Sequence, residues 1–149
     1  MSLSMSTIQS TLKGVLESIP ELSGVPVLVE DGAVDNDAAS LDALNTGKGI
    51  ALIVQRLARA DSTGDGVRPA KAEYIVPVTL QEKVSRNRSG DGTGEPAAAL
   101  IDAIILAILR HRDAGPPAFA LAPVPVVNLG AEQGLEEYVI TFRARVTYV

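Results

Sequence analysis

Residues 137–149 read EYVITFRARVTYV, and apolar and polar side chains alternate along almost the whole stretch. Successive side chains of a β-strand point to opposite faces, so the alternation predicts a strand with one buried face. The predicted buried face carries Tyr138, Ile140, Phe142, Ala144, Val146 and Tyr148. The opposite face carries Thr141, Arg143, Arg145 and Thr147. Such a strand needs an apolar layer against its inner face.

Residues 96–113, PAAALIDAIILAILRHRD, are expected to supply that layer as a helix. Pro96 suits the first turn of a helix, and the basic residues 110–112 suit the last turn, where the helix dipole favours cations. Asp102 is the only charged residue between Pro96 and Leu109, so apolar side chains surround the helix axis. Because a helix that is apolar all round is buried all round, we expect the sheet and either another helix or a second subunit to cover it.

The rest of the chain predicts one further helix and four further strands. Apolar residues at helical spacing predict a helix over residues 6–19, which Pro20 ends. Strands are expected at 25–30, 49–58, 72–84 and 123–129, with at most one helical turn near 40–44. Residues 60–71 and 85–96 are rich in Gly, Asp and Ser and are expected to be loops. Pro77 predicts an edge position or a bulge, because proline donates no ladder hydrogen bond.

The resulting order is α-β-β-β-α-β-β. It predicts an α+β fold, with an antiparallel or mixed β-sheet of about five strands and two helices packed on it. The 149 residues fit one domain, 1–149. We expect Tyr138, Ile140, Phe142, Val146, Leu100 and Ile104 to be buried together.

Composition excludes several classes of site. The chain has no Cys and a single His, so it has no disulfide, no thiolate metal site and no site that needs two histidines. The first residues lack the basic and apolar regions of a signal peptide, and the apolar run at 96–109 is shorter than the roughly 20 residues that span a bilayer. We therefore expect no membrane association. The net charge of −5 is unevenly spread, with −6 over residues 1–47 and +4 over residues 48–88.

Several motifs resemble ligand sites without completing them. DSTGDG at 61–66 and NRSGDG at 87–92 begin like EF-hand loops, but Ala72 and Ala98 stand where a bidentate Glu is required. The glycine-rich loop of residues 92–95, from Gly92 to Glu95, precedes a helix but lacks the Lys of a phosphate-binding loop. Tyr74 is the only aromatic residue among the basic residues between 56 and 88, and the sequence pI is about 4.8. We expect no enzyme, no metal, no cofactor and no dedicated nucleic-acid binding.

One segment resembles a known family. Residues 78–109 read VTLQEKVSRNRSGDGTGEPAAALIDAIILAIL, and this stretch resembles part of the tail-terminator or tail-completion (minor tail) proteins of long-tailed bacteriophages. The matching residues are Val78, Glu82, Asn87, Arg88, Gly92, Thr93, Gly94, Ala97, Leu100, Ile104, Ile108, Leu109 and His111. The closing strand at 137–149 and the order of elements are also similar, whereas GPPAFALAPVP at 115–125 departs from the pattern.

The resemblance implies a structural role in virion assembly. Such proteins cap the tail tube as a homo-oligomeric ring, usually a hexamer, and contact the tail tube protein and the head–tail connector protein. The implied locations are the host cytoplasm during assembly and the virion tail, of a phage or a prophage. The acidic and basic segments of the chain would suit head-to-tail contacts between subunits. The candidate interface residues are Arg86, Arg88, Ile101, Ile105, Arg143 and Arg145.

Two other functions stay open. One is a small ligand-binding or catalytic α+β domain that uses the loop of residues 92–95. The other is a bacterial accessory protein that only forms oligomers.

Overall fold

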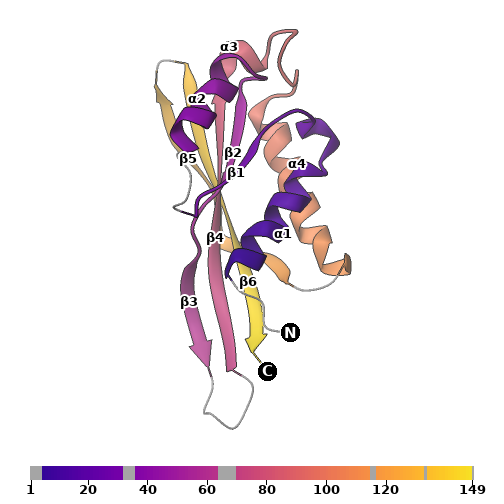
Figure 1. Ribbon diagram of the computed structural model, residues 1–149, viewed down its shortest axis with the longest axis vertical. Helices are drawn as coiled ribbons and strands as arrows, with labels where there is room; N and C mark the ends of the chain where they lie inside the picture. Colours follow the sequence, from indigo (N-terminus) through magenta and orange to yellow (C-terminus); the bar gives the residue numbers. More distant parts are fainter. Residues whose placement is uncertain (1–4, 32–35, 64–69, 115–116, 133, 149) are drawn as a thin grey trace.

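A six-stranded mixed sheet forms the centre of the protein, in the order β1-β2-β4-β6-β5, with β3 paired to β4 beside this path (Figure 1). The computed structural model describes residues 5–31, 36–63, 70–114, 117–132 and 134–148. The elements are α1 (Met5–Glu17), η1 (Pro20–Leu22), β1 (Val27–Val29), α2 (Asn36–Asn45), β2 (Ile50–Val54), β3 (Ala58–Thr63), β4 (Ala70–Lys83), α3 (Val84–Asn87), α4 (Ala97–Arg110), η2 (His111–Ala114), β5 (Ala118–Glu132) and β6 (Leu135–Tyr148). The predicted α+β class and mixed sheet are confirmed.

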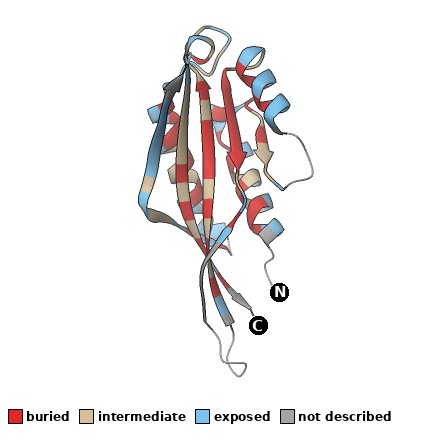
Figure 2. Ribbon diagram, turned by 90° about the vertical axis from the view of Figure 1, so that its left-hand side faces the viewer, coloured by how far each residue is buried: buried red, intermediate tan, exposed pale blue. Residues whose placement is uncertain are grey.

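β4 and β6 are the long central strands of the sheet. They pair antiparallel from Ala70 opposite Tyr148 to Lys83 opposite Leu135. The predicted inner face of β6 is confirmed, because Ile140, Phe142, Ala144 and Val146 are all buried. Tyr138 is half-buried and packs against the same core, whereas the side chain of Tyr148 lies outside the described residues. Figure 2 shows these buried positions in red along the central strands.

α1 and α4 cover the inner face side by side (Figure 1). The core they form with the sheet includes Ile8, Leu12, Leu16, Leu100, Ile104 and Ile108. α1 is therefore one of the elements that cover the apolar helix α4, as we expected. Leu106 remains 51% exposed, so α4 is not buried all round as predicted.

α2 packs on the opposite face of the sheet, where Ala43 and Leu44 meet Ala51. The Ser40 hydroxyl donates to Gln81 Oε1 at 2.5 Å, which fixes this helix to β4. The prediction of at most one turn near 40–44 is wrong, because α2 runs over ten residues. Its sequence has no regular apolar stripe, so contacts with the sheet stabilise a helix that periodicity did not predict.

Pro77 lies inside the sheet rather than at its edge, because β6 pairs with one side of β4 and both β2 and β3 pair with the other. The edge alternative of the prediction is therefore wrong, whereas the ladder on the β2 and β3 side is irregular next to this proline, since Val54 lies opposite Val78 and Ala58 opposite Ile75. The Gln55 N–H donates to the Pro77 carbonyl at 2.9 Å, but proline cannot return a hydrogen bond to Gln55. The side chain of Gln9 replaces it, with Nε2 3.0 Å from the Gln55 carbonyl oxygen and 3.2 Å from that of Glu30.

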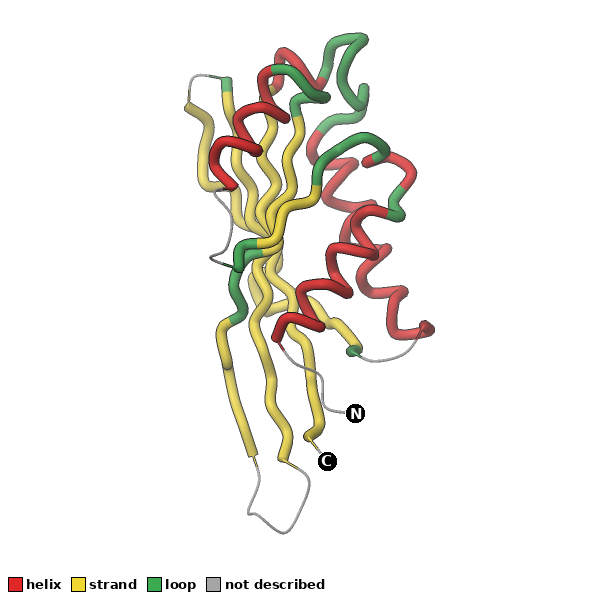
Figure 3. The backbone as a smooth tube through the Cα atoms, viewed as in Figure 1, coloured by secondary structure: helices red, strands yellow, loops and turns green. Residues whose placement is uncertain are grey.

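The lower ends of β3, β4 and β6 form an arm that projects beyond the helices (Figure 3). The prediction of a loop over residues 60–71 is wrong, because β3 extends to Thr63 and β4 begins at Ala70. Residues 64–69, which include half of the calcium-like motif at 61–66, lie outside the described residues. β3 forms through pairing with β4, with Ala58 opposite Ile75, and its own composition does not indicate a strand.

Candidate functional site

Asn87 is the centre of a polar hub that we define as Glu82, Asn87, Thr93 and the carbonyl of Glu95. The Asn87 Nδ2 donates to Glu82 Oε2 at 2.5 Å and to the Glu95 carbonyl at 2.9 Å. Its Oδ1 accepts from both the backbone N–H and the hydroxyl of Thr93. Asn87 is fully buried, so this side chain joins the end of β4, α3 and the loop before α4 into one unit.

Glu82 is the charged member of the hub. It is 0% exposed and lies near the end of β4, on the face that also carries Val78 and Leu80. Its Oε1 accepts no hydrogen bond from the described residues, but Arg88 Nη2 lies 3.6 Å from it. Removing a carboxylate from water costs several kcal/mol unless another charge compensates. The exposed Arg88 therefore stabilises the buried charge of Glu82 from the rim of the hub.

Two glycines allow the backbone to approach Asn87 closely. A Cβ at Gly92 would lie 2.1 Å from the Asn87 carbonyl oxygen, which is far inside van der Waals contact. A Cβ at Gly49 would lie 2.5 Å from the Asn87 nitrogen, and Gly49 also has a φ of +78°. Any side chain at either position would force the hub apart.

The loop of residues 92–95 takes part in the hub, although it was a candidate ligand loop. Thr93 directs its hydroxyl to Asn87, and the Gly94 N–H donates to the Asn87 carbonyl at 3.1 Å. Asp91, from the calcium-like motif at 87–92, lies 3.9 Å from Arg86 Nη1. Across the ranges that the structure describes, no three His, Asp or Glu side chains gather as a metal-binding group. The polar groups of this loop therefore serve the connection between β4 and α4.

Arg86, a predicted interface residue, binds the end of α2. Its Nε donates to the Gly47 carbonyl at 2.7 Å, and its Nη2 donates to the Thr46 carbonyl at 3.1 Å. The last carbonyls of a helix lack partners within the helix, and basic side chains satisfy them well. Arg86 therefore holds α2 against α3, and Arg88 holds Glu82, so both residues have contacts within the chain.

The two predicted interface residues of α4 differ from each other. Ile101 is 7% exposed and packs into the core of its own chain, so it offers little surface to a neighbour. Ile105 is half-buried against the same core. Asp102 is exposed, on the side of the helix that faces away from the core. His111 lies directly after α4, with its ring centroid 6.0 Å from that of Phe119.

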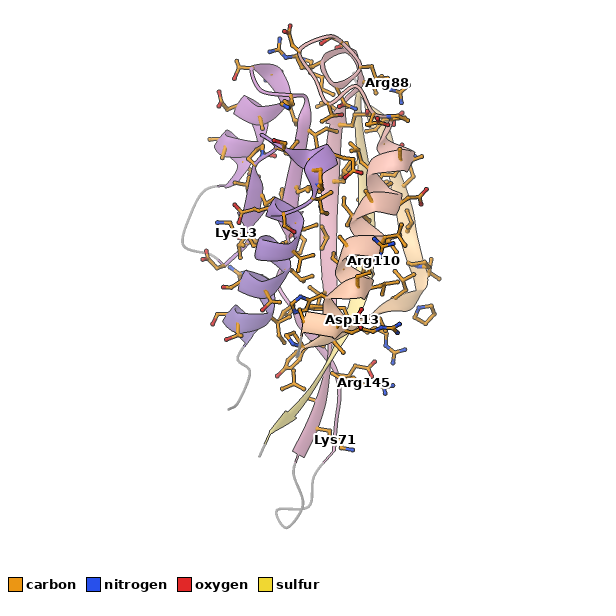
Figure 4. The ribbon with its side chains drawn as sticks, turned by 90° about the vertical axis from the view of Figure 1, so that its right-hand side faces the viewer. Lys13, Lys71, Arg88, Arg110, Asp113 and Arg145 are labelled. Carbon is orange, nitrogen blue, oxygen red and sulfur yellow. The ribbon has the colours of Figure 1, made fainter. Side chains whose placement is uncertain are left out.

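Arg143 and Arg145, the other predicted interface residues, flank Glu73 on the face of the arm opposite the core. Arg143 donates from Nε to Glu73 Oε1, and Arg145 Nε lies 3.4 Å from Oε2. The hydrogen bond from Arg143 is the main reason that the pKa of Glu73 lies below its usual range. The Arg145 side chain is 83% exposed, and Lys71 extends the positive surface toward the tip of the arm (Figure 4).

Tyr138 forms a second polar contact next to the hub. Its hydroxyl donates to Glu136 Oε2 at 2.7 Å. This hydrogen bond, together with partial burial, raises the pKa of Tyr138 to about 12. The ring therefore stays neutral over any physiological range and acts as a fixed hydrogen-bond donor.

β5 and the start of β6 carry an apolar strip that the sequence analysis missed. We define it by five exposed side chains, which are Val124, Val126, Val127 and Leu129 on β5 and Leu135 on β6. Val124 is 67% exposed and Leu129 is 60% exposed, although β5 pairs with β6 along one side. The sequence does contain an indication of this strip, which is the consecutive pair Val126 and Val127. Consecutive side chains of a strand point to opposite faces, and a strand with apolar residues on both faces is usually covered on both. Figure 2 shows this edge strand in pale blue.

Comparisons with protein-family models and with curated proteins find no match to this sequence. No helix in the described part of the chain is long and apolar enough to cross a membrane. The case for a function therefore depends on the hub, the arm and the apolar strip.

Proposed function

We propose that this protein is a non-enzymatic assembly protein of a long phage or prophage tail, which caps the tail tube as an oligomeric ring. The observation that carries the proposal is the convergence of the patterned residues. Glu82, Asn87 and Thr93 belong to the stretch that resembles tail-terminator proteins, and they meet in one buried hub. A motif that fixes the path of the backbone suits a protein whose task is to present surfaces accurately.

The exposed surfaces also support a role in assembly. Exposed apolar side chains along β5 and a positive arm are features of contact surfaces. In the proposed role these surfaces meet other subunits, the tail tube protein and the head–tail connector protein. Exposed ion pairs contribute only about 0–1 kcal/mol each, so apolar burial supplies most of the affinity and charge selects the partner.

Deletion of the gene from the phage or prophage that encodes it tests this function. Without a cap, tube subunits continue to add, so we expect tails of irregular length that are not joined to heads in electron micrographs. Adding purified wild-type protein to the lysate should restore head joining. Tails of normal length joined to heads after deletion, or a gene that lies apart from tail genes, would contradict the proposal.

Charge reversal at Arg86 is a poor test of the interface, because the variant would lose the contacts that hold the end of α2. Arg145 is a better position for such a test, since its side chain is 83% exposed and Glu73, its partner at 3.4 Å, keeps the hydrogen bond from Arg143. We expect Arg145→Glu to reduce head joining in the add-back assay. The matched control is Arg110→Glu, which reverses an exposed arginine on α4.

A further inference from the structure

Two arginines of β6 lie side by side on the face of the arm opposite the core. Arg143 and Arg145 are two residues apart on one strand, so their side chains leave the same face about 6.7 Å apart. Both contact Glu73 on β4, which lies directly opposite Arg145. The Glu73 side chain is 13% exposed, whereas those of Arg143 and Arg145 are 38% and 83% exposed. The carboxylate therefore lies beneath the two guanidinium groups, which meet the solvent.

The next strand on the other side of β6 leaves these guanidinium groups uncovered. Ala118 lies opposite Arg145 and Ala120 lies opposite Arg143, and both alanines are exposed. Residues directly opposite each other in an antiparallel pair share a face, so the side chains that flank the arginines there are methyl groups. A guanidinium carries five N–H donors. In the described part of the chain the contacts with Glu73 use few of these donors, so a ligand that approaches over β5 can reach the others.

Charge indicates which ligand suits this face of the arm. Lys71, which is exposed, lies two residues before Glu73 on the same face, so three cations accompany one carboxylate among these four described side chains (Figure 4). The whole chain, in contrast, carries −5. A nucleic acid duplex has one charge about every 1.7 Å, so it would extend from the arm over an acidic body. A short acidic segment of a protein needs no more surface than the arm offers.

We propose that this face of the arm binds an acidic segment of a partner protein in extended conformation, with one carboxylate on Arg143 and another on Arg145. Residues i and i+2 of an extended segment point to one side, at the same spacing as the two arginines. Arginine binds carboxylates through paired N–H groups. Glu73 acts as a positioning residue, because side chains that are held in place before binding lose less conformational freedom on binding.

The binding site stands on the structure alone. Only the assignment of the acidic segment to the tail tube protein or the head–tail connector protein rests on the proposed function.

Titration of the full chain with short peptides tests the site, and NMR follows the Nε–H signals of Arg143 and Arg145. The probes are capped peptides of sequence TETET and TEETT, which carry the same charge. When extended, TETET presents both glutamates on one face and TEETT presents them on opposite faces. We expect TETET to bind about threefold more tightly than TEETT at low ionic strength, where exposed ion pairs are least screened.

Two arginine variants locate the binding. Arg145→Gln should lower the affinity for TETET to that for TEETT. The matched control is Arg110→Gln, which removes an exposed positive charge from α4 and should leave the preference unchanged. Equal binding of the two peptides by the wild type would overturn the proposal, and so would a preference that survives in Arg145→Gln. Tighter binding of a thymidine trinucleotide, which also carries two charges, would overturn it in favour of a nucleic-acid contact.

Glu73→Gln separates positioning from net charge. The variant adds one positive charge to the face, so attraction alone predicts tighter binding of both peptides with the same preference. Loss of positioning predicts instead that the preference for TETET disappears, and this is the result we expect. A preference that persists in Glu73→Gln would overturn the role of Glu73. Urea unfolding of each variant verifies that the protein titrated is folded.

The tail assay separates this site from the proposed function. If wild-type protein restores head joining but binds TETET and TEETT equally, the acidic-segment site is refuted and the tail function is not. If the protein prefers TETET but deletion of the gene has no effect on tails, the tail function is refuted and the site is not.

Discussion

Asn87 illustrates how one buried amide can decide the path of a chain. It occupies both of its N–H groups and its carbonyl oxygen within the hub, so each neighbour has a defined place. A partly satisfied polar network in the interior costs stability, and the one buried acceptor of the hub without a hydrogen bond, Glu82 Oε1, lies 3.6 Å from the charged Arg88 Nη2. The close approach of Gly92 to the Asn87 carbonyl adds a steric requirement to this network, because only glycine fits there.

Gly92 and Gly90 form a matched pair for testing the hub. We expect Gly92→Ala to lower the free energy of unfolding by about 1–3 kcal/mol, because the new methyl group overlaps the Asn87 carbonyl. Gly90→Ala should have little effect, since nothing lies within 4 Å of a Cβ at that position. Urea unfolding of both variants provides the measurement. Equal losses would show that the hub tolerates displacement.

Phe142 tests the assignment of the buried face. It is 0% exposed at the centre of β6, so Phe142→Ala should lower the free energy of unfolding by about 3–5 kcal/mol. Leu106→Ala, at an exposed position, should change it by less than about 0.5 kcal/mol. A loss under about 1 kcal/mol at Phe142 would mean that the core can collapse around the missing ring.

Alternation and helical spacing predicted the core residues, because both patterns show directly which side chain of an element faces the core. Phe142, Ile140, Leu100 and Ile104 were all assigned correctly in this way. The hub was not predicted as a unit, since its members come from a strand, a short helix and a loop. Only the resemblance to tail proteins had grouped Glu82, Asn87 and Thr93, and it gave no geometry.

Among the elements, β1 and β2 depend on α1 through Gln9. Its amide donates to two carbonyls, one at the end of each strand, next to the proline that cannot donate. Gln9→Met keeps a similar volume but removes this donor, so we expect a loss of about 1–3 kcal/mol in unfolding free energy. Ser10→Met, at an exposed site on the same helix, is the control. Equal stability of the two variants would show that water satisfies the carbonyls.

The arm should respond to acid through Glu73. Because the Arg143 hydrogen bond lowers the folded-state pKa of Glu73, its contribution to stability is present above the ordinary value of 4.5 and is lost as the pH falls through the lowered pKa. We expect the stability difference between wild type and Glu73→Gln to shrink below pH 4.5 at low salt. Chemical denaturation at a series of pH values measures it. A difference independent of pH would contradict the assignment.

Elements formed by their own periodicity were predicted, and elements formed by neighbours were not. α1, α4 and β6 carry clear patterns and were recognised within a few residues. α2 and β3 have weak intrinsic patterns and exist because the sheet holds them. Pro77 lies inside the sheet and not at its edge because a side chain distant in sequence, Gln9, replaces its missing donor.

At the scale of the whole molecule, stability should not depend on a metal ion. The chain has no cysteine, and within the described ranges no group of His, Asp and Glu residues resembles a metal site. We expect purified protein to contain no stoichiometric metal and to melt at the same temperature with and without a chelator. A fall in melting temperature on chelation would contradict this expectation. Elemental analysis of the same sample identifies the ion in that case.

The pairing of β4 with β6 also determines when the molecule can fold. Ala70 lies opposite Tyr148, and the whole of α4 and β5 separates the two strands along the chain. Contacts between such distant residues slow folding, because a long loop must close before any pair gains energy. During synthesis, β4 and α4 leave the ribosome before the strand that completes their core. The nascent chain therefore has its central strand unpaired on one side until β6 emerges, and in this interval the free edge of β4 is open to incorrect pairing.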